Sequence, residues 1–182
     1  MCHAQQKASD RTCPSRLLGQ LVRMSVLLAA LALPATADAQ ARRQAQVLMS
    51  ENEDERRSQE EWGYADAVIA GDTIYLSGIV VGQREGESLE AAYDRAYRRI
   101  GAILTRAGAS WDDVVDMTTF HTDVTAQMPA IVAVHRRYVA GPFPAWTAID
   151  VDRLIPDRGI TEIKVVARRV SAEAREQSPR RR

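Results

Sequence analysis

The feature that most constrains the fold is an apolar stripe that begins after Ser88. Apolar residues recur at steps of three and four over about five turns, which predicts an amphipathic helix. Ser88 can cap its first turn, and Gly108 can end it in a left-handed conformation. Because a helix with one apolar face must cover another element, we expect a sheet against it. The stripe consists of Leu89, Tyr93, Ala96, Ile100, Ile103, Leu104 and Ala107.

A second helix is predicted between Asp123 and Gly141. Asp123 and Thr125 can cap its start, and Gly141-Pro142 ends it. Its apolar face consists of Met128, Ile131, His135 and Tyr138. Alternating and β-branched residues predict strands near 65–70, 73–79, 114–122, 146–151 and 161–167, with a loop over 80–87.

The order β-β-α-β-α-β-β predicts an α+β fold, with two helices packed on one face of a mixed or antiparallel sheet. A Pro156–Gly159 turn signal separates the last two runs, 146–151 and 161–167, so we expect them to be neighbouring strands. The other face of the sheet would have no helix to cover it. A domain of this size normally hides such a face by association.

The N-terminal residues 1–39 resemble a secretory signal. Basic residues precede a ten-residue apolar run, Met24–Leu33, and Ala37-Asp38-Ala39 gives a small-x-small cleavage pattern. This run is about half the length of a membrane-spanning helix. An uncleaved anchor and a mis-assigned start codon stay open as alternatives. Cleavage after Ala39 would make the protein periplasmic or secreted.

Three further segments follow the predicted cleavage. Residues 40–62 are dense in charge and are expected to be a flexible leader, residues 63–170 form the folded domain, and residues 171–182 form a disordered tail. Both cysteines, Cys2 and Cys13, lie before the cut, so the remainder has no disulfide and no thiolate metal ligand. We expect neither a metal site nor a cofactor.

The charge balance gives no support for a nucleic-acid partner. Four of the 24 basic and two of the 24 acidic residues lie within residues 1–39, which leaves a net charge near −2. The basic tail Arg180–Arg182 is more typical of a solvated terminus than of a binding patch. After signal cleavage we also expect no membrane contact.

Four segments resemble the RidA (YjgF) family. They are WGYADAV at 62–68, DTIYLSG at 72–78, FPAWTAIDVDRL at 143–154 and TEIKVVA at 161–167. The resemblance implies a RidA/chorismate mutase-like fold and a homotrimer whose sheets form a central barrel. It also implies small-molecule clefts between subunits, in which imines or enamines are hydrolysed to a carbonyl product and ammonia.

The resemblance also assigns site residues. Glu162 matches the glutamate that carries protons with an ordered water, and Tyr64 and Ser77 match residues that face the ligand. His135 stands where many members have an asparagine, although a histidine on an apolar stripe is more often a hydrogen-bonded core residue. Trp146 replaces the arginine that binds the substrate carboxylate, and an indole cannot form that two-pronged contact.

The loss of this arginine leaves two hypotheses from different classes. The first is an imine or enamine deaminase that uses another arginine, for which the candidates are Arg136, Arg137, Arg153 and Arg158. The second is a protein without catalytic activity that binds a small molecule or protects other proteins as a scaffold. Lys164 also changes the charge, since the family often has a second glutamate there. A ribonuclease would need a basic groove or a catalytic histidine pair, which the sequence does not indicate.

Overall fold

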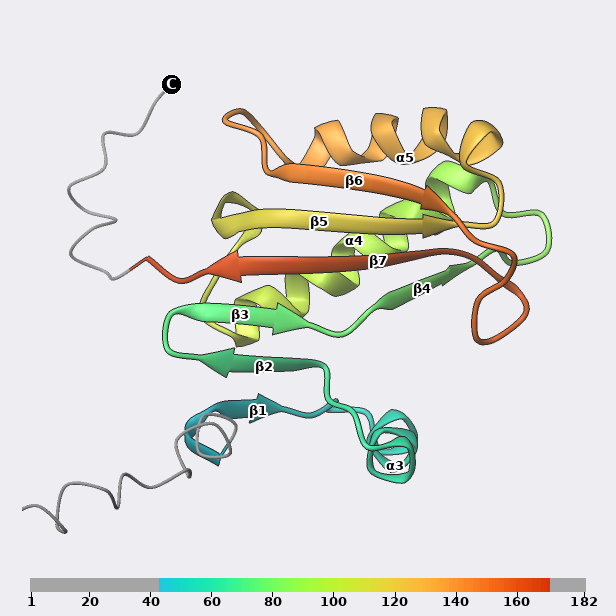
Figure 1. Cartoon of the computed structure of the whole chain (residues 1–182). Helices are drawn as coiled ribbons and strands as arrows, with labels where there is room; N and C mark the ends of the chain where they lie inside the picture. Colours follow the sequence, from blue (N-terminus) through green and yellow to red (C-terminus); the bar gives the residue numbers. More distant parts are fainter. Residues whose placement is uncertain (1–42, 171–182) are drawn as a thin grey trace, which may run out of the picture. The chain divides into compact units, whose positions relative to one another are not determined.

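The computed structural model describes residues 43–170, which form one sheet and three main helices (Figure 1). The strands are β1 (Gln46–Leu48), β2 (Ala67–Ala70), β3 (Thr73–Leu76), β4 (Ile79–Gly82), β5 (Val114–His121), β6 (Ala145–Asp150) and β7 (Gly159–Arg168). The helices are α3 (Glu53–Trp62), α4 (Leu89–Arg106) and α5 (Val124–Tyr138), with a 3-10 turn at Trp111–Asp113. The predicted signal and the predicted tail lie outside the described residues.

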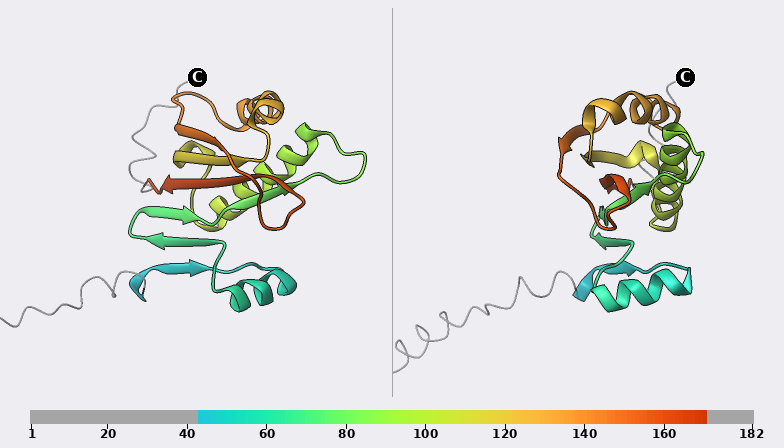
Figure 2. Two further views of the ribbon diagram at one scale, coloured as in Figure 1. Left: turned by 45° about the vertical axis from the view of Figure 1, so that its right-hand side comes forward. Right: turned by 90° about the vertical axis from the view of Figure 1, so that its right-hand side faces the viewer.

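The sheet is mixed. Its strands follow the order β1-β2-β3-β7-β5-β6, and β4 also pairs with β7. The pairs are antiparallel except β5 with β6, which run parallel and are connected through α5. Both α4 and α5 lie on one face of the sheet (Figure 2). The predicted α+β class and the packing of these two helices on one face are therefore confirmed.

The core lies between the helices and the sheet. The α4 side chains Tyr93, Tyr97, Ile100 and Leu104 are fully buried. Ser88 caps this helix by accepting the amide of Ala91 at 3.2 Å, as the sequence predicted. Asp123 caps α5 in the same way, through the amide of Ala126 at 2.9 Å. None of the helices within residues 43–170 is long and apolar enough to cross a bilayer.

The prediction that the last two strands are neighbours is wrong. β5 lies between β6 and β7, pairing in parallel with β6 and antiparallel with β7. The segment between β6 and β7 is thus a loop that crosses the end of β5. A parallel pair needs a crossover connection, which α5 supplies between β5 and β6. Turn residues alone do not show whether two successive strands pair directly.

The prediction of a flexible leader is wrong for residues 43–62. This segment forms β1, which pairs with β2, and α3, a third helix that the sequence analysis missed. Asn52 caps α3 by accepting the amides of Asp54 and Glu55. Gln59 is the one buried residue of α3. Because the helix packs through polar contacts, it lacks the apolar stripe on which the prediction depended.

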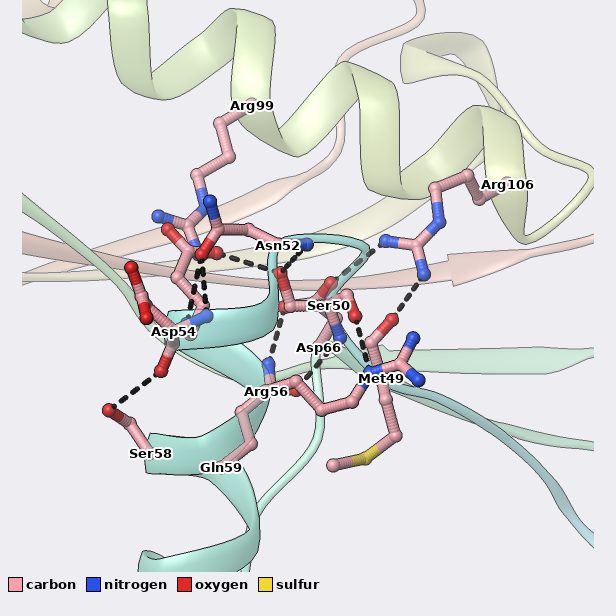
Figure 3. Close-up of polar contacts among 11 residues, drawn as sticks. Met49, Ser50, Asn52, Asp54, Arg56, Ser58, Gln59, Asp66, Arg99 and Arg106 are labelled. Carbon is pink, nitrogen blue, oxygen red and sulfur yellow. Dashed lines mark hydrogen bonds and ion pairs between the residues drawn. The ribbon is translucent and has the colours of Figure 1, made fainter.

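A polar network attaches this segment to the rest of the domain (Figure 3). Gln59 donates from Nε2 to Asp66 Oδ1 at 2.8 Å, and its Oε1 accepts the amide of Ser50 at 2.8 Å. Arg106 on α4 donates to Asp66 Oδ2 at 2.8 Å and to the carbonyl oxygen of Met49. The buried carboxylate of Asp66 therefore joins α3, β2 and α4.

The strand predicted at 73–79 is interrupted at Ser77-Gly78. β3 and β4 both pair with the same edge of β7, and the pairs Tyr75–Val166 and Ile79–Ile163 flank the interruption. Residues 76–78 on one strand thus face residues 164–165 on the other. One extra residue on one side of a ladder re-aims nearby side chains, and such irregularities are frequent beside functional sites. β4 also occupies the start of the segment predicted as a loop.

Candidate functional site

A cavity of about 570 Å³ opens at the interruption between β3 and β4. It brings together three of the residues that the sequence assigned to the site: Tyr64, Ser77 and Glu162. We call it the Glu162 cavity. Its lining residues are Ser58, Trp62, Tyr64, Ser77, Gly78, Val80, Ile155, Pro156 and Glu162.

The backbone around Gly63 places Tyr64 and Ser77. Gly63 ends α3 in the left-handed conformation, with φ 73°, so the chain turns sharply into the segment that carries Tyr64. The Ser77 hydroxyl donates to the carbonyl oxygen of Ala65 at 2.6 Å, and its amide donates to that of Asp66 at 3.0 Å. Ser77 therefore offers the cavity a hydroxyl oxygen that can accept a hydrogen bond.

The carboxylate of Glu162 lies directly over the backbone of Gly78. A Cβ atom added to Gly78 would be 1.7 Å from Glu162 Oε1, so only glycine leaves room for this position. Glu162 is half-buried, and its carboxylate has no hydrogen-bond or ion-pair partner among residues 43–170. The sheet register flanks it with Val80 on β4 and Phe120 on β5. An unpaired carboxylate between apolar neighbours is able to exchange protons with a ligand or water.

The rim of this cavity is apolar and exposed. Trp62 is 67% exposed, Ile155 is 68% exposed and Tyr64 is 48% exposed. Neither Trp62 nor Ile155 was predicted from the sequence as a site residue. Trp62 could have been predicted from the sequence as a site residue, because it directly precedes the Gly63-Tyr64 pair, which contains a predicted site residue. Ile155 carried no signal, because its position depends on the loop that connects β6 to β7.

Trp146 and His135 lie outside this cavity. The Trp146 ring packs 4.7 Å from the His135 ring, between β6 and α5, and its indole N–H donates to Thr119 Oγ1 at 3.0 Å. His135 Nδ1 lies 3.1 Å from the Tyr97 hydroxyl. Burial lowers the pKa of His135 and so favours its neutral form. We call Trp146, His135, Thr119 and Tyr97 the Trp146 cluster.

A buried polar network continues from this cluster to His121. His121 Nδ1 lies 3.0 Å from Gln127 Oε1, which can only accept, so Nδ1 carries the proton. His121 Nε2 then accepts from the Thr119 hydroxyl at 2.9 Å. Burial lowers the pKa of His121, which keeps the ring neutral. The described part of the chain holds no group of three or more His, Cys, Asp or Glu that could bind a metal ion.

The four arginines that the sequence suggested as candidates for binding a substrate carboxylate differ in their surroundings. Arg137 pairs with Glu90 at 2.8 Å, and Arg153 lies 3.9 Å from Asp157. Arg136 is exposed on α5. Arg158 lines a second cavity, which shares Val80 and Pro156 with the Glu162 cavity. Lys164 is exposed on β7, on the same face of the sheet as Glu162.

Residues 55–169 match the sequence model of the family described as Endoribonuclease L-PSP. The chain belongs to this family, also called RidA or YjgF. RidA-family proteins include the RutC family protein YjgH of Escherichia coli, which is 38% identical over 111 residues, 58% of this chain and 82% of YjgH. The 2-iminobutanoate/2-iminopropanoate deaminase of Capra hircus is 32% identical over 109 residues, 57% of this chain and 78% of that protein.

The RidA fold is also recognised among solved structures. A member of the YjgF/YER057c/UK114 family from Mycobacterium tuberculosis superposes with a TM-score of 0.60 at 25% identity. The match covers 69% of this chain and all of the mycobacterial chain. The RidA-like fold predicted from the four motifs is therefore confirmed. The assignment to the site stays a prediction for Glu162, Tyr64, Ser77, Trp146 and His135.

Proposed function

We propose that this RidA-family protein hydrolyses reactive imines or enamines to a carbonyl product and ammonia in the Glu162 cavity. The observation that carries the proposal is the Glu162 carboxylate, which lies over Gly78 without a protein partner. The name of the Capra hircus relative supports the reaction class. Deaminase activity in this chain is compatible with Trp146 only if another group binds the charged end of the substrate.

In the proposed reaction, Glu162 moves protons between water and the substrate nitrogen. The substrate reacts as the imine protonated at nitrogen. The carboxylate accepts a proton from water as the water oxygen adds to the imine carbon, which gives a neutral carbinolamine. This proton then passes from Glu162 to the nitrogen, the carbon–nitrogen bond breaks as ammonia leaves, and the carboxylate accepts the hydroxyl proton as the carbonyl forms. Tyr64 and Ser77 orient the substrate, with the Ser77 oxygen accepting a hydrogen bond from its nitrogen.

We further propose that the protein is a homotrimer with clefts between its subunits. The sheet face opposite α4 and α5 carries the exposed apolar side chains Tyr75, Val115 and Ile149, which association would cover. The Trp146 cluster adjoins β6, at the end of the sheet. Association through the exposed face would bring a neighbouring subunit close to the Glu162 cavity, while Trp146 and His135 keep their contacts between β6 and α5. Light scattering of residues 40–182 should give the trimer mass, and a stable monomer at micromolar concentration would contradict the proposal.

The activity can be tested by ammonia release from freshly generated 2-aminoacrylate. Glu162→Gln keeps the side-chain size but removes the proton acceptor, so the rate should fall roughly 100-fold or more. Glu60→Gln, at an exposed position on α3, is the matched control and should retain the parent rate. Equal rates for Glu162→Gln and the parent would remove Glu162 from the mechanism.

A second candidate function is binding without catalysis. The exposed apolar rim of Trp62 and Ile155 favours a ligand with an apolar part, and Trp146 is uncharged. Calorimetric binding of an apolar keto acid by a protein that releases no ammonia from any imine tested would support this alternative over the deaminase.

Export is a proposal that rests on residues 1–39. Mass spectrometry of the protein from its native host should find the chain beginning at Gln40. Intact Met1 in a soluble cytoplasmic fraction would contradict it.

A further inference from the structure

The second cavity, which we call the arginine cavity, has a volume of about 600 Å³. It lies beside the Glu162 cavity, and Val80 and Pro156 contribute to the walls of both. Its lining residues are Val80, Gly82, Gln83, Arg84, Glu85, Arg95, Pro156, Arg158 and Gly159. Because two residues are shared, one elongated ligand can extend from one cavity into the other.

Arg95 is fixed at the wall of this cavity by internal contacts. Its guanidinium donates to Glu87 Oε2 at 2.7 Å and to the carbonyl oxygen of Gly82 at 2.9 Å. The hydrogen bond from Arg95 lowers the pKa of Glu87, which therefore stays ionised and compensates the charge of Arg95. Arg95 thus supports the wall rather than attracting an anion.

Arg158 and Arg84 add positive charge to this cavity, which Glu85 in the lining and the attraction of Arg84 to Glu87 offset in part. Both are exposed, and neither side chain has a hydrogen bond or ion pair within residues 43–170. Arg158 directly precedes Gly159, where an added Cβ would be 2.7 Å from Val80 Cγ1 and 3.1 Å from the Pro156 carbonyl oxygen. This close approach holds the backbone next to Arg158 against the wall that the two cavities share.

The strand register sets the spacing between Arg158 and Glu162. Glu162 pairs with Val80, and Gly159 pairs with Gly82, two residues further along β4. At about 3.3 Å per residue, Gly159 and Glu162 are separated by roughly 7 Å along β4, and Arg158 lies one residue beyond Gly159. If the imine carbon lies at Glu162, a carboxylate attached directly to that carbon also lies close to Glu162. It would be too far from the Arg158 guanidinium for a close ion pair. A carboxylate several bonds further along the substrate fits better.

We propose that Arg158, assisted by Arg84, binds a distal carboxylate of the substrate, so that the preferred substrates are imines of dicarboxylic amino acids. This inference rests on the proposed function for the reaction at Glu162. It explains how the chain can bind an anionic imine with tryptophan at position 146. The imine end lies over Gly78, the carbon chain crosses Val80 and Pro156, and the side-chain carboxylate meets the guanidinium groups.

Keto acid binding to the full protein tests the subsite without requiring turnover. 2-Oxoglutarate and 2-oxopentanoate have the same chain length and differ in the distal carboxylate. Calorimetry should show 2-oxoglutarate binding roughly 10- to 100-fold more tightly, the range expected for one charge-assisted contact. Arg158→Gln should reduce this preference to about threefold or less. Arg153→Gln, at an exposed position in the same loop, should leave it unchanged.

The outcomes separate the subsite from the reaction. Equal binding of the two keto acids by the parent, or a preference that survives in the Arg84→Gln/Arg158→Gln double variant, would overturn the subsite. Preferential 2-oxoglutarate binding without ammonia release from any imine would keep the subsite and overturn the deaminase. Ammonia release at equal rates from 2-iminopropanoate and 2-iminoglutarate, unaffected by Arg158→Gln, would keep the deaminase and overturn the subsite.

Discussion

The Glu162 cavity and the Trp146 cluster contain the two halves of the site predicted from the sequence, and they differ in how their polar groups are satisfied. The Glu162 carboxylate has no partner among residues 43–170. In the Trp146 cluster, the indole N–H donates to Thr119 and His135 pairs with Tyr97. The first region can exchange protons with a ligand, whereas the second uses its hydrogen-bonding groups to stabilise the packing of α5 on the sheet.

This difference shows that position in a motif does not fix the role of a residue. The motif predicts a ligand-binding position for residue 146, yet the structure gives Trp146 the contacts of a residue packed against the core. Glu162 lies without a protein partner among residues 43–170, which leaves its carboxylate free to contact a ligand. Substitutions in the Glu162 cavity should therefore change activity more than stability, and those in the Trp146 cluster should change stability more than activity.

The largest effect should come from Gly78→Ala. The three heavy atoms nearest to the added methyl group all belong to the Glu162 side chain, so we expect the carboxylate to move while the fold stays intact. We expect ammonia release to fall about 100-fold or more and the melting temperature to change little. Because both changes remove the same group, adding Glu162→Gln should cause little further loss. Full activity of Gly78→Ala would show that the position over Gly78 is not the catalytic one.

Arg106→Gln should show how much the network around Asp66 stabilises the domain. It removes the charge partner of Asp66, whose side chain is 6% exposed, so we expect a loss of about 2 kcal/mol in the free energy of unfolding. Arg57→Gln removes an exposed pair with Asp54 and should cost less than about 1 kcal/mol. Urea unfolding measures both. Equal losses would contradict the role assigned to Asp66.

Trp146→Phe tests the packing role assigned to the Trp146 cluster. Phenylalanine keeps an aromatic ring against His135 but cannot donate to Thr119, which should lower the free energy of unfolding by about 1 kcal/mol. Activity on 2-iminoglutarate should stay within about twofold of the parent. A much larger loss of activity at unchanged stability would move Trp146 into the catalytic site.

The smallest effect concerns acid stability. Burial holds the folded-state pKa of His135 below its ordinary value of 6.5, so the unfolded chain takes up the proton first. The stability from neutral His135 is full above about pH 6.5 and is lost as the pH falls toward the folded-state pKa. Urea unfolding at pH 7.5 and 5.5 should show a shallower decline for His135→Gln. His121 preserves part of the slope, because burial lowers its pKa as well.

The parts of the fold that could be predicted from the sequence were those in which apolar residues recur at a regular spacing. The stripe from Leu89 to Ala107 placed α4, and the caps at Ser88 and Asp123 placed two helix starts. α3 was missed because Gln59 and Asp66 hold it through polar contacts between distant segments, which leave no period. The pairing of β5 with both β6 and β7 depends on a crossover, which a turn signal between two strands does not reveal.

Only the site residues that lie within the family motifs could be predicted from the sequence. They named Tyr64, Ser77 and Glu162, which the structure gathers in one cavity. The roles of Ile155 and Arg158 depend on the conformation of the β6–β7 loop, and no residue pattern encodes that conformation. The arginine cavity therefore became visible only in three dimensions.

The interruption between β3 and β4 contains one residue more than the facing segment of β7. Without Gly78, residues 74–81 would pair with β7 in a single continuous register, with Ile79 and Val81 still directed at the core. We expect deletion of Gly78 to yield a regular strand that lacks the position over which the Glu162 carboxylate lies. The pairing of β3 and β4 with β7 thus contains one extra residue, and a single deletion there is an evolutionary route to a family member without this cavity.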